Sequence, residues 1–134
     1  MDAFDADVLI YAAAFGHALG RPVRRLFAAG REPVVAGVGS VLLLPELLAK
    51  PLREQALDEL DELGALLGRL DLRPTDEATA DLATALAARY RLRVADAVHL
   101  ATAVNAGADR FLTNNSKDFP KSIVEIDITY PTDL

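Results

Sequence analysis

The chain has 134 residues, of which 51% are hydrophobic and 25% charged, and its net charge is −6. This length predicts one domain, residues 1–134, and this composition excludes a disordered or fibrous chain. The absence of cysteine excludes disulfides and thiolate zinc sites. Because the start MDAFDADV is acidic where a signal peptide is basic, and no apolar run could span a bilayer, we expect a cytoplasmic protein without membrane contact.

The acidic net charge does not exclude a nucleic-acid partner. Five acids crowd into residues 54–68, which contain no Lys or Arg, so the rest of the chain is close to neutral. If several of the remaining acids hold a divalent metal ion, the surface left over is mildly basic.

In chain order, the first predicted elements are a strand and two helices. Residues 2–5 form a short apolar strand, and Asp7 is placed to cap a helix that begins at Val8. A second helix follows Pro22, a residue that suits a first helical turn, and ends at Gly30.

The next segment predicts a buried strand and a helix. PVVAGV, residues 33–38, is apolar throughout, as expected of a strand buried on both faces. Ser40 then caps a helix that runs through Lys50, in which Pro45 is expected to introduce a kink.

Residues 52–68 have the pattern of an amphipathic helix, followed by the short extended piece LDLRP. Apolar residues step along one face by four, three, four and three: Ala56, Leu60, Leu63, Leu67 and Leu70. A further helix is predicted from Thr75 to about Arg89, with Ala78, Leu82 and Leu86 on one line.

The last third of the chain predicts one helix and two strands. VADAVHLATAVNAG forms a helix closed by Gly107, and DRFLTNN and SIVEIDI are strands. Alternating strands and helices predict a three-layer α/β/α fold with a central, mostly parallel sheet. Ligands bind such sheets at the carboxyl ends of the strands, where Asp5 and the pair Asn114–Asn115 are expected.

Four acids are candidates for chemistry. Asp5 ends the first strand, Glu46 is the charge in the apolar run VLLLPELLA, Asp96 opens a helix, and Asp118 lies in the loop NNSKDF. Clustered carboxylates repel by roughly 4 kcal/mol per pair at about 4 Å and an effective dielectric near 20. A hard divalent cation relieves that repulsion, and ligands made of oxygen alone favour Mg²⁺ or Mn²⁺.

Each of these residues also has a plain structural interpretation. Asp5 could cap a turn, although Asp7 suits that role better; Asp96 could complement a helix dipole; and Asp118 could be a turn residue. Glu46 is expected in the middle of an apolar face, where an acid gains nothing locally.

Other polar residues carry weaker predictions. His99 follows Asp96 by three residues and could bind metal, although a structural role is favoured. Thr113 could orient a carboxylate or a phosphate, or simply fill a strand position. Basic residues form two groups that could contact a phosphate backbone or face solvent: Arg21, Arg24, Arg25 and Arg31, and Arg89, Arg91 and Arg93.

Three segments together, FDADVLIYA, LLLPELLA and VADAVHLATAVNAGADRFLTNNSKDF, resemble the PIN domain, and most closely ribonuclease toxins of the VapC type. The resemblance implies that Asp5, Glu46 and Asp96 are the first three metal-binding acids. The family's fourth position, commonly Asp, falls on Asn115, with Asp118 close behind, so either residue could complete the site. At Asp7 the family more often has a small neutral polar residue.

By this resemblance the chain is expected to cleave RNA phosphodiester bonds with Mg²⁺ or Mn²⁺, leaving a 5′-phosphate and a 3′-hydroxyl. The implied catalytic residues are Asp5, Glu46, Asp96, Asn115 and Asp118, and the acids among them are the implied metal ligands. The resemblance also implies a homodimer and silencing by a cognate antitoxin, for which the predicted helix 52–68 is a candidate contact.

Two other classes of protein remain open from the sequence. FDADV also fits the D-x-D motif of haloacid-dehalogenase-like phosphatases, in which Asp5 would be the nucleophile and Asp7 the general acid. Alternatively, the chain is a PIN-like module that binds RNA or protein and has lost catalysis through Asn115.

Overall fold

The computed structural model describes residues 1–28 and 35–134. Its five strands are β1 (Asp2–Phe4), β2 (Gly37–Ser40), β3 (Leu70–Arg73), β4 (Arg110–Leu112) and β5 (Asp127–Thr129). Its helices are α1 (Ala6–Ala13), α2 (Gly20–Ala28), α3 (Leu43–Arg53), α4 (Leu57–Leu67), α5 (Glu77–Tyr90) and α6 (Val94–Asn105), followed by the single 3₁₀ turn η1 (Pro131–Asp133).

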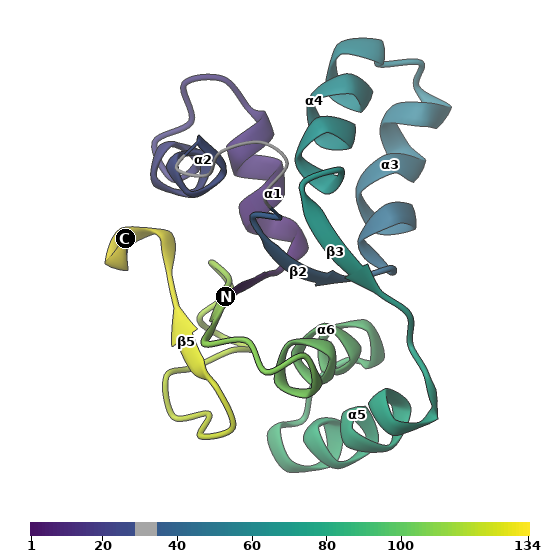
Figure 1. Cartoon of the computed structure of the whole chain (residues 1–134), viewed down its shortest axis with the longest axis vertical. Helices are drawn as coiled ribbons and strands as arrows, with labels where there is room; N and C mark the ends of the chain where they lie inside the picture. Colours follow the sequence, from purple (N-terminus) through teal and green to yellow (C-terminus); the bar gives the residue numbers. More distant parts are fainter. Residues whose placement is uncertain (29–34) are drawn as a thin grey trace.

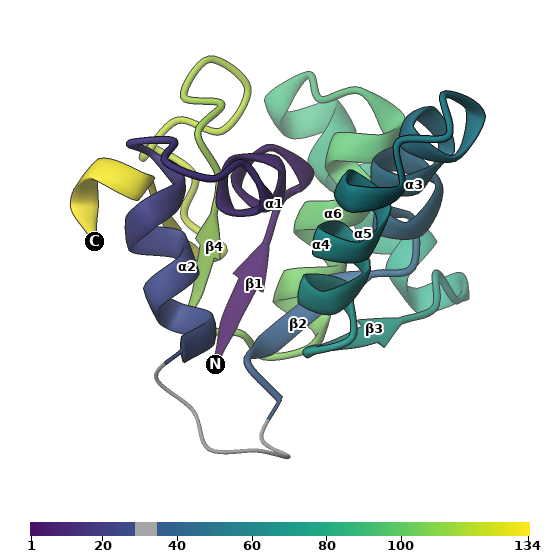
Figure 2. The ribbon, with the colours of Figure 1, turned by 90° about the horizontal axis from the view of Figure 1, so that it is seen from above.

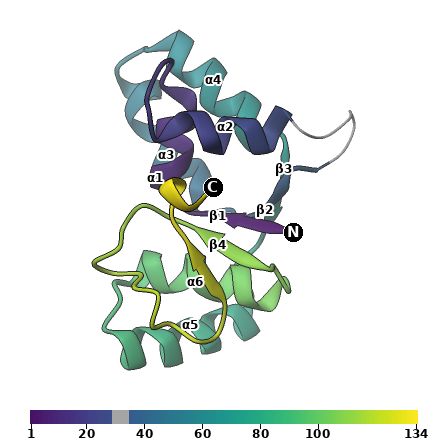
Figure 3. The same cartoon turned by 90° about the vertical axis from the view of Figure 1, so that its left-hand side faces the viewer.

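The strands form one sheet in the order β3-β2-β1-β4-β5, and every pair of neighbours within it is parallel. Helices α1 to α4 cover one face and α5 and α6 the other, so the predicted three-layer α/β/α fold is confirmed (Figures 1 and 3). The strand order reverses between β1 and β4, which are adjacent (Figure 2). Such a reversal opens a crevice at the carboxyl ends of the two strands.

Each central strand supplies both hydrophobic cores, because successive side chains point to opposite faces. Ala3 and Phe111 pack into the core under α5 and α6, whereas Phe4 and Leu112 pack into the core under α1 to α4. These four side chains are 1–2% exposed. The two cores fix the sheet between its helices, and they thereby fix the positions of the loops that leave the carboxyl ends.

The start of α1 corrects the sequence prediction. Asp5, not Asp7, is the N-cap: its backbone is extended, and its Oδ1 accepts a 2.8 Å hydrogen bond from the amide of Ala6. The chain turns here because the amide of Asp5 still donates to the carbonyl of Leu112 in the neighbouring strand. The helix therefore begins two residues earlier than predicted, at Ala6.

Helix α2 also begins early, at Gly20, two residues before Pro22. A Cβ atom at Gly20 would lie 2.0 Å from the carbonyl oxygen of Tyr11, so α2 crosses close to the end of α1 where only glycine fits. Pro22 still lies in the first turn, where its missing N–H costs nothing. The predicted end at Gly30 lies outside the described residues.

Strand β2 and the start of α3 both lie further along the chain than predicted. Residues 33–34 lie outside the described part, and the strand begins only at Gly37, where its neighbours Asp2 and Leu70 also begin to pair. Ser40 is the last residue of this strand rather than a helix cap, and its Oγ accepts a hydrogen bond from Leu42. Helix α3 follows from Leu43 and continues beyond the predicted end at Lys50.

The predicted helix 52–68 is largely confirmed by α4, Leu57–Leu67, but its predicted start falls in the last turn of α3. The chain turns between α3 and α4 at Gln55, whose φ of 53° is left-handed, and the two helices pack against each other. Leu63 and Leu67 are buried as predicted. The apolar spacing did not reveal the turn because Ala56 continues the same periodicity across it.

Of the three later elements, α5 and β5 differ from the prediction in detail and α6 agrees with it. Helix α5 begins at Glu77, two residues after the predicted start, and Asp76 is its N-cap. Its buried face is Thr79, Ala83 and Leu86 rather than the line through Ala78. Helix α6 ends as predicted before Gly107, whose φ is +70°. Strand β5 is limited to three residues because β4 offers only three partners, so SIVEIDI is mostly irregular.

Within the described part of the chain, no helix combines the length and the apolar character that a bilayer crossing requires.

Candidate active site

The centre of the site is the pair Asp5 and Thr113, which leave the carboxyl ends of the adjacent strands β1 and β4. The Thr113 hydroxyl donates a 2.8 Å hydrogen bond to Oδ2 of Asp5, and Thr113 is fully buried. Asp5 is 6% exposed, and its second oxygen is held by the amide of Ala6. The interpretation that Thr113 orients a carboxylate is confirmed, and Asp5 is fixed on both oxygens.

The loop after β4 is closed by a reciprocal pair of hydrogen bonds. The side-chain amide of Asn115 donates to Oδ2 of Asp118 at 2.9 Å, and the amide of Asp118 donates to Oδ1 of Asn115 at 3.2 Å. The backbone amide of Asn115 donates to Oγ1 of Thr113 at 3.1 Å. Asn115 therefore fixes Asp118 and ties the loop to the hydroxyl that orients Asp5.

The other two candidate acids come from helices on opposite faces of the sheet. Asp96 lies in the first turn of α6, and Glu46 lies in the first turn of α3. The prediction that Glu46 lies in the middle of an apolar face was wrong. Its side chain is one-third exposed (33%), because the first turn of α3 faces the carboxyl end of the sheet. Its Oε2 lies 3.0 Å from Nε2 of the buried His99.

A family model described as the PIN domain matches residues 3–121. The chain belongs to the PIN domain family. Nucleases of this family generally use divalent metal ions. The assignment sets aside the alternative of a haloacid-dehalogenase-like phosphatase. No curated protein matches the sequence.

Three solved structures have the same fold as this PIN domain. A toxin–antitoxin complex from Klebsiella pneumoniae matches with a TM-score of 0.76 at 22% identity, covering 100% of both chains. VapBC2 from Rickettsia felis, bound to a DNA fragment from their promoter, matches with 0.71 at 17% identity over 96% of this chain and 97% of that one. DNA-bound VapBC from Salmonella typhimurium matches with 0.67 at 20% identity over 97% of each.

Electrostatics links the acids at the carboxyl end of this PIN domain. The pKa of Asp5 is raised, mainly because the carboxyl is buried, and the negative charge of Asp96 adds to the effect. The pKa of Asp96 is raised by burial, then by Asp118, and further by Glu46. The charge of His99 acts in the opposite direction on Asp5 and on Asp96. Every candidate acid therefore lies within electrostatic range of Asp96.

The acids approach one another without already enclosing an ion. Among residues 1–28 and 35–134, no three acidic or histidine side chains lie close enough together to hold a metal ion. The donor set nevertheless fits a hard divalent cation, because it consists of carboxylate oxygens. Burial, and then neighbouring carboxylates, raise the pKa values of Asp5 and Asp96.

Asp7 is a further acid beside Asp5, and the PIN resemblance did not count it among the implied metal ligands. Its Oδ2 accepts a 3.0 Å hydrogen bond from the amide of Asn114, which joins the first turn of α1 to the loop after β4. Its Oδ1 is buried and has no partner among the described residues. Burial, followed by the charge of Asp5, raises the pKa of Asp7 to about 6. The spacing D-x-D in FDADV was the available clue to this role.

Of the two predicted groups of basic residues, the one that includes Arg93 is the one beside Asp96. Arg93 immediately precedes α6, and its charge lowers the pKa of Asp96. Arg91 lies in the turn between α5 and α6, whereas Arg89 is paired with Glu125 at 3.5 Å. In the other predicted group, Arg24 donates to the carbonyl of Ala12 and lies over the ring of Phe15. Arg31 lies outside the described residues.

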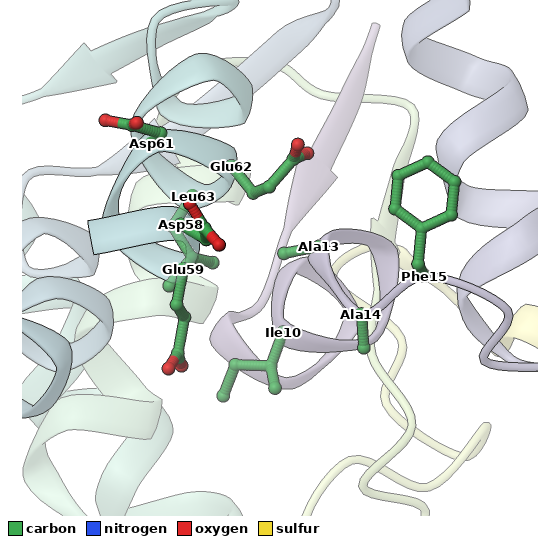
Figure 4. A pocket seen from close by; sticks show the side chains of 9 residues that line it. All are labelled: Ile10, Ala13, Ala14, Phe15, Asp58, Glu59, Asp61, Glu62 and Leu63. Carbon is green, nitrogen blue, oxygen red and sulfur yellow. The ribbon is translucent and has the colours of Figure 1, made fainter. Parts of the chain in front are cut away.

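A groove of about 590 Å³ separates α1 from α4 (Figure 4). One wall is apolar, and in it Phe15 is 86% and Ile10 47% exposed. The opposite wall is acidic: Glu62 points across the groove towards α1, whereas Asp61 points away (Figure 4). The sequence indicated the acidic wall as part of helix 52–68, but it did not indicate the apolar wall opposite.

Proposed function

We propose that this PIN domain is a divalent-metal-dependent ribonuclease and the toxin of a toxin–antitoxin pair. The observation that supports the proposal is that Asp5, Glu46 and Asp118 all interact electrostatically with Asp96. These acids come from four separate segments, and burial and mutual repulsion raise the pKa values of Asp5 and Asp96. Such an arrangement costs stability unless a cation compensates it.

In this proposal the four acids hold Mg²⁺ or Mn²⁺. The bound ion would supply Lewis-acid chemistry, neutralising charge on the phosphate and activating water for an in-line displacement. Thr113 orients Asp5 through its 2.8 Å hydrogen bond, and Asn115 orients Asp118. Arg91 and Arg93 are exposed in the turn that leads into α6, and in this proposal they contact the phosphate backbone of the RNA.

The proposed activity is tested by incubating the purified chain with single-stranded RNA in Mn²⁺, in Mg²⁺ and in excess EDTA. We expect cleavage with either metal, none in EDTA, and products that carry a 5′-phosphate and a 3′-hydroxyl. Cleavage that persists in EDTA, or products with a 2′,3′-cyclic phosphate, would contradict the metal mechanism. RNA binding without cleavage in either metal would favour the alternative of an inactive binding module.

The groove between α1 and α4 supports the proposed antitoxin partner. An exposed phenyl ring and an exposed isoleucine are costly to leave in water, and α4 faces them with Asp58, Glu59 and Glu62. We propose that the occupant is an amphipathic segment of the antitoxin that presents apolar residues to α1 and lysine or arginine to α4. Charge complementarity of this kind speeds association and selects the partner.

The partner proposal is tested with the protein encoded by the neighbouring open reading frame. Phe15→Ser and Glu62→Lys should each weaken its binding by at least about tenfold, whereas Glu77→Lys, an equal charge change on the exposed start of α5, should not. Equal binding by all three variants would remove the groove from the interface. The homodimer implied by the resemblance stays a prediction, which light scattering of the free chain tests.

A further inference from the structure

His99 is a buried polar residue that contacts the candidate site through Glu46. The proposed chemistry does not use this side chain. It lies on α6, three residues after Asp96, and is 3% exposed. Its neighbours along the helix, Val98 and Leu100, are core residues. A histidine at such a position needs a polar partner, because a buried imidazole without one is destabilising.

The ring makes one directional contact. Nε2 lies 3.0 Å from Oε2 of Glu46, and it donates this hydrogen bond because a carboxylate offers only acceptors. Nδ1 is buried and has no partner among the described residues. The polar capacity of His99 is therefore directed at Glu46 alone.

The carboxylate of Glu46 is held by fewer contacts than those of Asp5 and Asp118. Asp5 is held on both oxygens, and Asp118 is held by Asn115. Glu46 has a longer side chain on an exposed turn of α3, and the contact with His99 is the one hydrogen bond of its carboxylate among the described residues. Without it, the carboxylate would be free to turn into solvent.

We propose that His99 is a positioning residue that holds Oε2 of Glu46 and thereby restricts this carboxylate to the side of the site where, with Asp5 and Asp96, it would hold the metal ion. The inference rests on the proposed metal-dependent function and adds a residue that the acids alone do not reveal. The contact also links α3 to α6, two helices that lie on opposite faces of the sheet.

The test compares two substitutions of His99 with a control on the same helix. His99→Phe keeps a ring in the core but removes the donor, whereas His99→Gln keeps a donor at nearly the position of Nε2. Thr102→Val is the control, because Thr102 is also buried on α6 but donates only to the carbonyl of Val98. Mn²⁺ affinity is measured by calorimetry, and folding is measured by thermal unfolding without metal.

We expect His99→Phe to weaken Mn²⁺ binding by about 10- to 100-fold, the usual effect of losing a contact that orients a ligand. His99→Gln should stay within about threefold of the wild type, and Thr102→Val should match it. Unchanged Mn²⁺ affinity in folded His99→Phe overturns the proposal. So does a loss in His99→Gln as large as that in His99→Phe, since the donor would then be irrelevant.

A second measurement needs neither metal nor activity and covers the case in which His99→Phe does not fold. In the metal-free protein, the ¹⁵N and ¹H resonances of the Nε2–H group should shift on Glu46→Ala and stay unchanged on Asp58→Ala. Identical resonances in Glu46→Ala would overturn the contact. A wild-type protein that binds Mn²⁺ but cleaves no RNA would contradict the proposed nuclease, while the binding comparison would still decide the role of His99.

Discussion

Two groups of acids in this PIN domain have the same chemistry and opposite surroundings. The first, here called the end cluster, consists of Asp5, Glu46, Asp96 and Asp118. The second, here called the α4 row, consists of Asp58, Glu59, Asp61 and Glu62, all of which are exposed on one helix. In the α4 row, water screens the repulsion between neighbours that are close in sequence.

The end cluster is assembled from residues far apart in sequence, and there the repulsion is not fully screened. Burial is the first cause of the raised pKa values of Asp5 and Asp96, and neighbouring carboxylates add to it. The density of acids along the sequence would select the α4 row as the charged feature of this protein. The fold instead perturbs the sparse acids, because it brings Asp5 and Asp96 together with other carboxylates where solvent is reduced.

The strongest test of this comparison neutralises one acid in each group. Asp96→Asn should lower RNA cleavage by at least about 100-fold, because Asp96 is the carboxylate within range of all the others. Glu59→Gln removes the same charge from the α4 row and should leave the rate unchanged. The measurement is the initial cleavage rate in Mn²⁺, with thermal unfolding as the check on folding. Wild-type activity in Asp96→Asn would sink the assignment of the end cluster.

The second test adds charge rather than removing it. Mn²⁺ or Mg²⁺ should stabilise the folded protein by about 2.7 kcal/mol at 100 times the dissociation constant, because the ion binds only the assembled end cluster. The measurement is the melting temperature across a metal titration, with Ca²⁺ for comparison. Asp96→Asn should lose the shift and Glu59→Gln should keep it. A melting temperature that does not respond to either metal would count against a metal site.

The third test concerns the pH dependence of stability without metal. The pKa of Asp7 in the folded protein is about 6, above the ordinary 3.8, so the folded state holds this proton more tightly than the unfolded state does. Stability is therefore lost as pH rises from about 4 to 6. The difference corresponds to roughly 3 kcal/mol, and we expect about 1–2 kcal/mol because water screens the partly exposed carboxyl.

Asp7→Asn removes that loss while keeping an acceptor for the amide of Asn114. In urea unfolding with EDTA present, the variant should be more stable than the wild type at pH 7 and similar to it near pH 4. Asp58→Asn, from the α4 row, should show no such pH-dependent difference. A constant gap between Asp7→Asn and the wild type from pH 4 to pH 7 would contradict the raised pKa.

The sequence predicted the layers and the order of the candidate acids, but not how those acids are held. Asp5 and Asp7 are equally good caps by residue type, and the choice depends on the hydrogen bond from Asp5 to Leu112, a contact over more than a hundred residues. Similarly, the exposure of Glu46 and its contact with His99 depend on how the sheet positions α3 and α6, which lie on its opposite faces (Figure 3). Such facts are tertiary, so local patterns cannot contain them.

The smallest expected effects concern Asn115 and Asp118, the two candidates for the fourth position of the site. Asn115 is neutral and donates to Asp118, which the structure thereby fixes within range of Asp96. Asp118→Ala should weaken metal affinity by about tenfold, since it removes a charge, and Asn115→Ala by about threefold, since it only loosens that charge. The measurement is cleavage rate against Mn²⁺ concentration.

Asn115→Asp distinguishes an orienting amide from a missing ligand. It would set two carboxylates against each other across the 2.9 Å contact with Asp118, so the metal-free protein should be less stable than the wild type. With saturating Mn²⁺ the repulsion is relieved, and activity should equal or exceed that of the wild type. Full activity and metal affinity in Asp118→Ala, together with loss of both in Asn115→Ala, would instead make Asp118 a loop residue. The end cluster would then hold its ion with three carboxylates, and Asn115 itself would be the fourth contact.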